Sequence, residues 1–203
     1  DLLNILSSSI GSLTNPEKLK NTFKTVKKSK ITAATIKKYI DCFEDSFLID
    51  SAERYDIKGR SYIETPKKYY FSDLGLRNAR IGFRQPEMTH ITENIVYNEL
   101  IIRGYSVDVG VITTRERNKE GKQISVPREI DFIATKGGKK VYIQSAYAML
   151  TEEKQQSELK PFSLVGDSFP KIVVRHDIGK RFYDDNGVLN IGVIDFLLDN
   201  DVV

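Results

Sequence analysis

Apolar residues in the first 47 positions recur at helical spacing and predict three helices. The first runs from Leu2 to about Gly11. The second opens with Asn15 as its cap and Pro16 at its first position, a combination typical of a helix start. The third follows Thr32, and its apolar stripe is expected at Ile36, Ile40, Phe43 and Phe47.

Two strand-like runs, 48–55 and 67–71, follow these helices. Three helices and a two-stranded hairpin predict a winged helix-turn-helix, whose third helix would enter the major groove of DNA. Its candidate nucleic-acid contacts are Lys27, Lys28, Lys30, Thr35, Lys37 and Lys38. The alternatives are a solvated basic surface and a winged helix that docks on protein.

The second half of the sequence predicts helix, three strands, helix and strand. The first helix spans His90–Arg103, and its acid Glu93 is expected at the surface. A strand over 105–113 and a charged loop over 115–128 precede a hairpin of 129–134 and 141–146, turned at Gly137 and Gly138. A helix capped by Thr151 and strands at 171–175 and 191–196 complete the pattern, which predicts a three-layer α/β domain.

Candidate chemistry is concentrated on the 129–146 hairpin. Alternation places Glu129 and Asp131 on one face of a strand, with Ile130, Phe132 and Ala134 on the other. This layout resembles a PD-(D/E)XK nuclease core, in which an Asp, then an acid and a Lys on the next strand, hold a divalent metal and its water. Gln144 and Ala146 stand at the last two positions, so we expect a degenerate site without catalysis. Asp131 and Gln144 are the remaining metal-ligand candidates, for Mg²⁺ or Mn²⁺ if the site is active. The resemblance also gives Glu93 as the helix-borne acid that some such nucleases add to the metal site, so Glu93, Glu129, Asp131, Gln144 and Ala146 are the vestigial positions.

Charge divides the chain unevenly. The net charge is +3, but residues 1–85 carry 16 Lys and Arg against 10 Asp and Glu, whereas residues 86–203 carry 15 against 18. The basic excess favours an anionic partner, with DNA as the candidate, for the first part.

The single Cys42 fits a reducing, cytoplasmic compartment, and the sequence shows no membrane-spanning run or signal peptide. Because the chain opens at Asp1, we expect it to be part of a longer protein.

Several segments together resemble the C-terminal region of a large family of prokaryotic proteins predicted to be AAA+-type ATPases. These segments are 73–78, 93–100, 129–134 and the strand end at Gln144. The resemblance implies a P-loop ATPase module upstream of Asp1, with its ATP and Mg²⁺, followed by a winged helix and a PD-(D/E)XK-like domain of unknown function. The chain itself has no P-loop sequence.

We therefore expect an α/β protein with a winged helix-turn-helix domain at 1–85 and a degenerate restriction-endonuclease-like domain at 86–203. The expected function is that of a non-catalytic module that binds nucleic acid or a protein partner for its own upstream ATPase domain. One alternative is a metal-dependent DNA nuclease repaired by Lys139, Lys140 or Glu129. The other is a pure protein-interaction module that docks on the ATPase domain.

Overall fold

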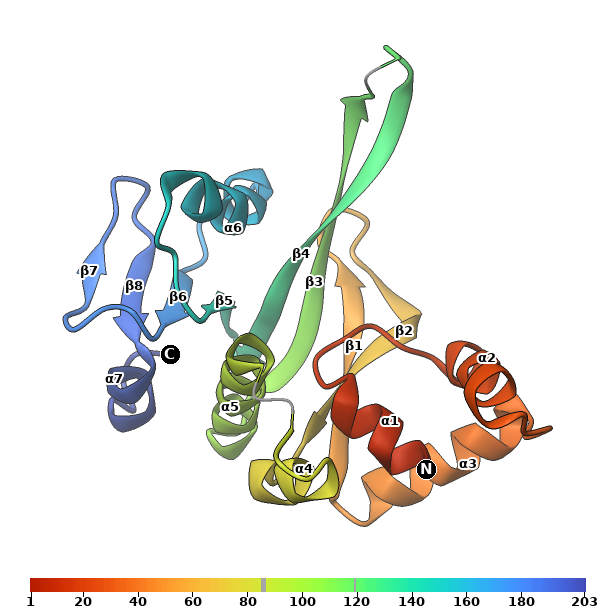
Figure 1. Cartoon of the computed structure of the whole chain (residues 1–203). Helices are drawn as coiled ribbons and strands as arrows, with labels where there is room; N and C mark the ends of the chain where they lie inside the picture. Colours follow the sequence, from red (N-terminus) through yellow and green to blue (C-terminus); the bar gives the residue numbers. More distant parts are fainter. Residues whose placement is uncertain (85–86, 119) are drawn as a thin grey trace.

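A computed structural model describes residues 1–84, 87–118 and 120–203. Among these residues, eight strands form one mixed sheet in the order β2-β1-β3-β4-β5-β6-β8-β7 (Figure 1). The expected domain boundary between residues 85 and 86 lies outside the described residues. The helices are α1 (Leu2–Ser8), α2 (Pro16–Lys27), α3 (Ala33–Asp45), α4 (Leu74–Arg80), α5 (Met88–Ile102), α6 (Glu152–Leu164) and α7 (Val193–Leu198). The strands are β1 (Ile49–Asp56), β2 (Ser61–Phe71), β3 (Ser106–Arg117), β4 (Gln123–Lys136), β5 (Lys139–Ala146), β6 (Lys171–Arg175), β7 (Phe182–Tyr183) and β8 (Leu189–Gly192).

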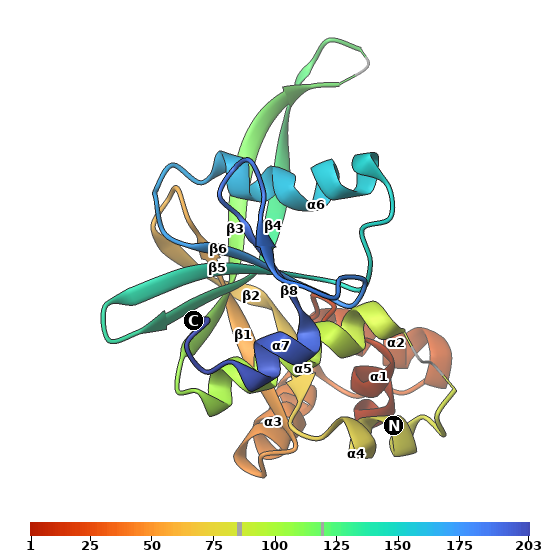
Figure 2. The ribbon, with the colours of Figure 1, turned by 90° about the vertical axis from the view of Figure 1, so that its left-hand side faces the viewer.

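The sheet lies between helices on both faces. Helices α5 and α7 pack on one face, where Val96, Leu100 and Phe196 join the largest apolar cluster. Helix α6 covers the other face through Phe162 (Figure 2). A third cluster joins α1, α2 and α3 to the ends of β1 and β2. The described part of the chain contains no helix long and apolar enough to cross a membrane.

Local signals placed several helix starts correctly. The side chains of Asn15, Thr32 and Thr151 each accept a hydrogen bond from the backbone N–H three residues on, as N-caps do. The apolar stripe of α3 was predicted correctly at Ile36 and Ile40, which are buried. It was wrong at Phe47, which is 82% exposed because α3 ends at Asp45 and Phe47 lies in the following turn with a positive φ.

The expected hairpin of β1 and β2 is present, but it is not a separate wing. Strand β1 pairs antiparallel with β2 and also parallel with β3, between Arg54 and Val109, so the hairpin continues the large sheet. A backbone bridge between Thr14 and Lys67 joins the α1–α2 connection to the same hairpin. The N-terminal helices are therefore fixed to the sheet that carries the candidate site.

Two predictions about the second half are corrected, and one helix of the first half was missed. The expected loop 115–128 is mostly strand, since β3 continues to Arg117 and β4 begins at Gln123. The expected strand 191–196 is strand only to Gly192, after which the chain forms α7. Helix α4, capped by Asp73, was not predicted as a helix.

A bulge corrects the expected faces of the 129–146 hairpin. Between the pairs Gly110–Ile130 and Asp108–Ile133, β4 contains one residue more than β3. Ile130 and Ile133 consequently pack toward α6, whereas Phe132 and Ala134 pack in the cluster of α5. The predicted common face of Ile130, Phe132 and Ala134 is therefore wrong. The extra residue lies at the position of Asp131 and Phe132.

Candidate functional site

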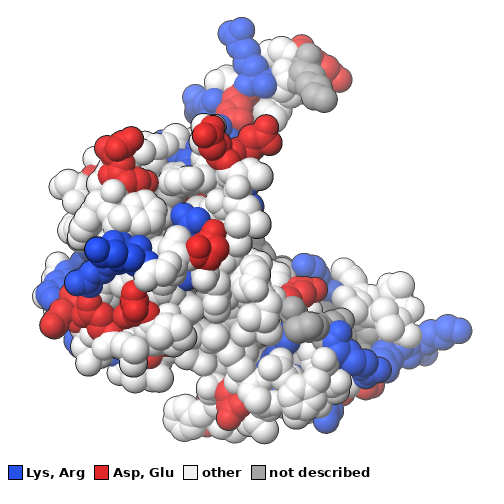
Figure 3. Space-filling model, turned by 60° about the vertical axis from the view of Figure 1, so that its left-hand side comes forward, with Lys and Arg blue, Asp and Glu red and all other residues white. Residues whose placement is uncertain are grey.

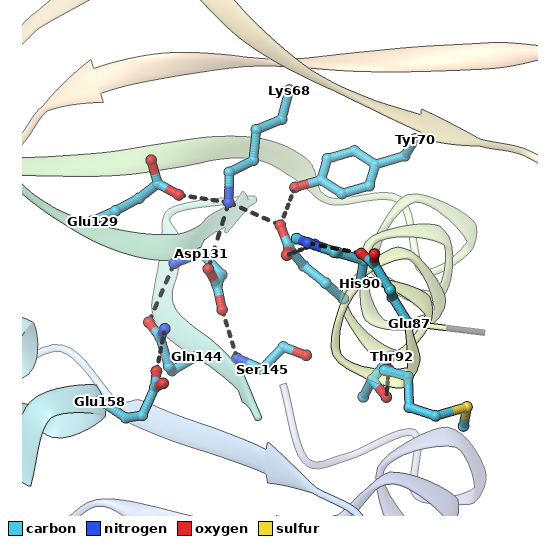
Figure 4. A network of polar contacts seen from close by, with 12 residues as sticks. Lys68, Tyr70, Glu87, His90, Thr92, Glu129, Asp131, Gln144, Ser145 and Glu158 are labelled. Atoms are coloured by element: carbon cyan, nitrogen blue, oxygen red, sulfur yellow. Dashed lines mark hydrogen bonds and ion pairs between the residues drawn. The ribbon is translucent and has the colours of Figure 1, made fainter. Parts of the chain in front are cut away.

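The site is a buried polar cluster centred on Lys68 of β2 (Figure 4). Lys68 and Tyr70 lie two residues apart on β2, so their side chains share one face of the strand, and both contact Glu93 of α5. The Lys68 Nζ lies 2.9 Å from Oε1 of Glu93, 2.5 Å from Oε1 of Glu129 and 3.6 Å from Oδ1 of Asp131. Burial lowers the pKa of Lys68, but attraction to these carboxylates outweighs burial and raises it. Lys68 is therefore a buried cation at neutral pH.

Glu93 is buried on α5, contrary to the expected surface position. Its Oε1 accepts hydrogen bonds from Lys68 and, at 2.7 Å, from the Tyr70 hydroxyl. Nδ1 of His90, one turn earlier, lies 3.7 Å from Oε2 of Glu93. Burial raises the pKa of Glu93, but Lys68 and the hydrogen-bond donors lower it by more. The net pKa is therefore lowered, and the carboxylate is held ionised. Glu93 in turn raises the pKa of His90 more than burial lowers it.

Asp131 and Glu129 come from β4. The Oδ2 of Asp131 accepts the backbone N–H of Ser145 at 2.9 Å, which ties the carboxylate to β5. Burial first, and then repulsion from Glu93, raises the pKa of Asp131 to about 7 despite the attraction of Lys68. Glu129 remains about one-third exposed, so it marks the outer edge of the cluster.

Gln144 lies beside Asp131, as predicted. Its Oε1 accepts the backbone N–H of Asp131 at 3.3 Å, and its Nε2 donates to Glu158 of α6 at 3.2 Å. Ala146 is buried in the apolar cluster under α6 and contributes no polar group. The structure thus brings Glu93, Glu129, Asp131 and Gln144 together, with Ala146 in the apolar layer beside them.

The arrangement does not fit the divalent metal that the nuclease resemblance implies. Within residues 1–84, 87–118 and 120–203, no three His, Cys, Asp or Glu side chains are grouped so that they could hold a metal ion. The Lys68 ammonium lies among the carboxylates that would be the ligands. A divalent cation at this place would have to displace that ammonium, because two cations would otherwise share the same oxygens.

Lys68 was missed by sequence reasoning, which considered Lys139 and Lys140 as replacement lysines. Lys139 is exposed beside the β4–β5 turn. Lys140 lies over the rings of Tyr142 and Phe169 and 3.7 Å from Asp167. The sequence signal that could have identified Lys68 is its place between Lys67 and two tyrosines, within a run that was already predicted to be a strand. A charged residue on the inward face of a strand requires a buried partner.

The predicted nucleic-acid contacts lie apart from this cluster, on α2, α3 and the segment between them. The side chains of Lys27, Lys28, Lys30, Lys37 and Lys38 are exposed, and Thr35 is half-buried. Lys27 lies 3.6 Å from Asp1, and Lys37 pairs with Asp41 one turn on in α3 at 2.9 Å. Thr35 bonds the cap residue Thr32 through its own N–H and hydroxyl, which limits its freedom to reach a ligand.

The described residues form an α/β protein with one mixed sheet and a carboxylate cluster centred on Lys68. Residues 1–87 match the family described as "Domain of unknown function (DUF8612)". Over 196 residues the chain is 35% identical to a Haemophilus influenzae protein described as "Uncharacterized protein". The match covers 95% of this chain but 44% of that protein, so the chain spans less than half of its relative's length. No solved structure matches the chain.

Proposed function

We propose that the chain is the non-catalytic C-terminal module of an AAA+-type ATPase and binds nucleic acid for that motor. The observation that carries the proposal is the Lys68 ammonium among Glu93, Glu129 and Asp131. A protein cation there neutralises part of the negative charge that would otherwise bind a metal. Together with Gln144 and Ala146, this supports a scaffold that binds rather than cleaves.

Two further observations support the proposed architecture. Helices α1–α3 share one apolar cluster with the β1–β2 hairpin, and the Thr14–Lys67 bridge fixes the α1–α2 connection to it. That arrangement supports a unit like a winged helix, in which the hairpin is part of the large sheet and α3 faces a partner. The relative extends well beyond the 44% of its length that this chain matches, which leaves room for the proposed ATPase module with its ATP and Mg²⁺. Such a protein would work in the cytoplasm.

The test is the salt dependence of DNA affinity. If the exposed lysines of α2 and α3 contact phosphates, log K should fall linearly with log salt, with a slope of about −0.9 per contact on duplex DNA. We expect K27Q/K30Q/K38Q to weaken binding and to reduce this slope by up to about 2.7. Fluorescence anisotropy on a labelled duplex at several salt concentrations measures both quantities.

The control is K154Q/K180Q, which removes two exposed lysines outside α2 and α3, against three in the tested variant. It should leave the slope unchanged. If the wild-type chain has no affinity for DNA or RNA at low salt, the proposal is wrong. A stable complex with the separately expressed ATPase module would then support the pure protein-interaction alternative.

The alternative candidate is a metal-dependent nuclease, which would need a divalent cation to displace the Lys68 ammonium from the carboxylates. A lysine supplied by β2 could replace the one that the nuclease pattern lacks at Ala146. In that case Mn²⁺ or Mg²⁺ should support DNA cleavage that is lost in both K68A and D131A. We expect no cleavage by the wild-type chain at any metal concentration, measured on labelled duplex and single-stranded DNA. Cleavage that requires Lys68 and Asp131 would contradict the non-catalytic proposal.

A further inference from the structure

Strands β3 and β4 extend beyond the sheet as a two-stranded ribbon (Figure 1). Pairing of β3 with β1 ends at Val111, and pairing of β4 with β5 begins only at Phe132. The β3–β4 pairing continues without these neighbours from Val111–Glu129 to Arg117–Gln123. In the part of the chain that the structure describes, both outer edges of the ribbon are therefore unpaired. This ribbon corresponds to the segment 115–128 that the sequence predicts to be a charged loop.

The two faces of the ribbon differ in chemistry. Residues opposite each other in an antiparallel pair project to the same face, so the register assigns each side chain. One face, here called the arginine face, is exposed throughout and contains Thr113, Arg115, Arg117, Gln123, Ser125 and Pro127. The other face carries Thr114, Glu116, Ile124, Val126 and Arg128. The arginine face thus has two cations and no acid.

Contacts on the second face hold the ribbon together. Arg128 donates to Glu116 at 2.5 Å, and the Thr114 hydroxyl donates to the Val126 carbonyl at 3.2 Å. At the tip, Oδ1 of Asn118 accepts the backbone N–H of Lys122 at 2.8 Å. Arg115 and Arg117 form no ion pair with any described residue. The ribbon is therefore stiffened from one side, while the guanidinium groups of the arginine face are free to bind.

The charge of the ribbon favours an anionic partner. By sequence, residues 113–128 contain five Lys and Arg against two Asp and Glu, an excess of +3 that equals the net charge of the whole chain. On the face drawn in Figure 3, charged groups of both signs are scattered over the body, and the ribbon projects above it with basic and acidic side chains near its end. The ribbon is thus an element with a net basic charge, whose end projects from the globular body while Glu116 lies 3.9 Å from Lys160 of α6.

We propose that the arginine face lies in the major groove of duplex DNA. That groove admits a two-stranded β-ribbon, and Arg and Gln are the side chains that pair with guanine and adenine edges there. Arg115, Arg117 and Gln123 are the residues that contact base edges or the flanking phosphates, and Ser125 extends the same polar row. This proposal goes beyond the α2–α3 surface and rests on the proposed binding of nucleic acid.

The experiment compares R115Q/R117Q with the wild-type chain and with K154Q/K180Q, which removes the same charge elsewhere. Anisotropy titrations use a labelled 24-base-pair duplex and one of its single strands. We expect R115Q/R117Q to weaken duplex binding at least about tenfold, because each substitution removes a guanidinium that can pair bidentately with a guanine edge. Single-strand binding should change far less, and thermal unfolding should confirm that the exposed substitutions leave the fold intact.

The outcomes separate this inference from the proposed function. Duplex affinity that drops in K27Q/K30Q/K38Q but not in R115Q/R117Q overturns the ribbon contact and leaves the α2–α3 surface in place. Equal losses on duplex and single strand contradict recognition of the groove. If R115Q/R117Q instead abolishes a dimer seen in sedimentation velocity, the arginine face joins two copies of the chain and the DNA contact is wrong. If the wild type does not bind DNA, both proposals fail.

Discussion

Replacing Lys68 with Met should lower the free energy of unfolding by about 3–5 kcal/mol at pH 7 to 8. Met fills a volume similar to the Lys stem but carries no charge, so the substitution leaves Glu93 and Asp131 buried without their cation. Removing one partner of a buried ion pair is far more costly than removing the whole pair, because the remaining charge cannot be solvated. Urea denaturation followed by circular dichroism measures the difference.

The adjacent residue provides a matched control. Lys67 has the same chemistry and lies on the same strand, but its ion pair with Glu53 at 2.7 Å is partly exposed. Lys67→Met should therefore cost at most about 1 kcal/mol. Adding Glu93→Gln to Lys68→Met removes one of the uncompensated charges. The amide oxygen of the new Gln can still accept the hydrogen bond of the Tyr70 hydroxyl, so the double variant should recover part of the lost free energy of unfolding. Equal effects of Lys67→Met and Lys68→Met would contradict the buried cation.

The penalty of Lys68→Met should depend on pH in a defined direction. The raised pKa of Lys68 means that its stabilising effect is fully present below about pH 10 and is lost above it. The depressed pKa of Glu93 means that its stabilising effect is present above about pH 4 and is lost as the pH falls further. In the variant Glu93 loses the partner that kept it ionised. It can then take up a proton on acidification, and the penalty should shrink from pH 8 toward pH 5.

Local features of the sequence were sufficient for the elements that depend on near neighbours. A cap residue and the backbone N–H that donates to its side chain lie within one turn of helix, which is why the starts at Asn15, Thr32 and Thr151 were predictable. The two-residue turn at Gly137 and Gly138 is equally local, since both glycines adopt positive φ. The architecture follows from these elements only in part, because the pairing of β1 with β3 unites segments far apart in the chain.

Other features depend on tertiary contacts that no short window contains. The ribbon was misread because both of its faces are solvated, and a charged strand without a buried face lacks the usual alternation. The run 191–196 was ambiguous because a short apolar segment suits a strand or a buried helix equally well. The candidate site could not be predicted without the tertiary fold. Only the packing of β2 against α5 and β4 shows that Lys68 meets Glu93 and Asp131.

The pH dependence of stability should also differ between the wild-type chain and Asp131→Asn. The pKa of Asp131 is raised to about 7, against about 4 in an unfolded chain, so the folded state holds a proton that the unfolded state has lost. Stability from this group is fully present below about pH 4 and is lost as the pH rises toward 7. Relative to Asp131→Asn, the wild type should therefore lose about 2–4 kcal/mol across this range.

Asp177 gives a control of opposite sign. Hydrogen bonds from Arg175 lower the pKa of Asp177 to about 2, so its contribution is present at neutral pH and is lost only in acid. Asp177→Asn should accordingly leave the slope between pH 5 and pH 8 unchanged. Unfolding free energies at four pH values in that interval measure all three proteins. Parallel curves for the wild type and Asp131→Asn would contradict the raised pKa.

The same measurement separates a binding module from a nuclease. A divalent cation that coordinated Asp131 would compete with its proton, pull its pKa down and flatten the wild-type slope, while Asp131→Asn would not respond. Because the Lys68 ammonium already lies 3.6 Å from this carboxylate, we expect millimolar Mg²⁺ or Mn²⁺ to leave the slope as it is. A flattened slope in the wild type alone would show that the cation coordinates Asp131, and it would contradict the non-catalytic proposal.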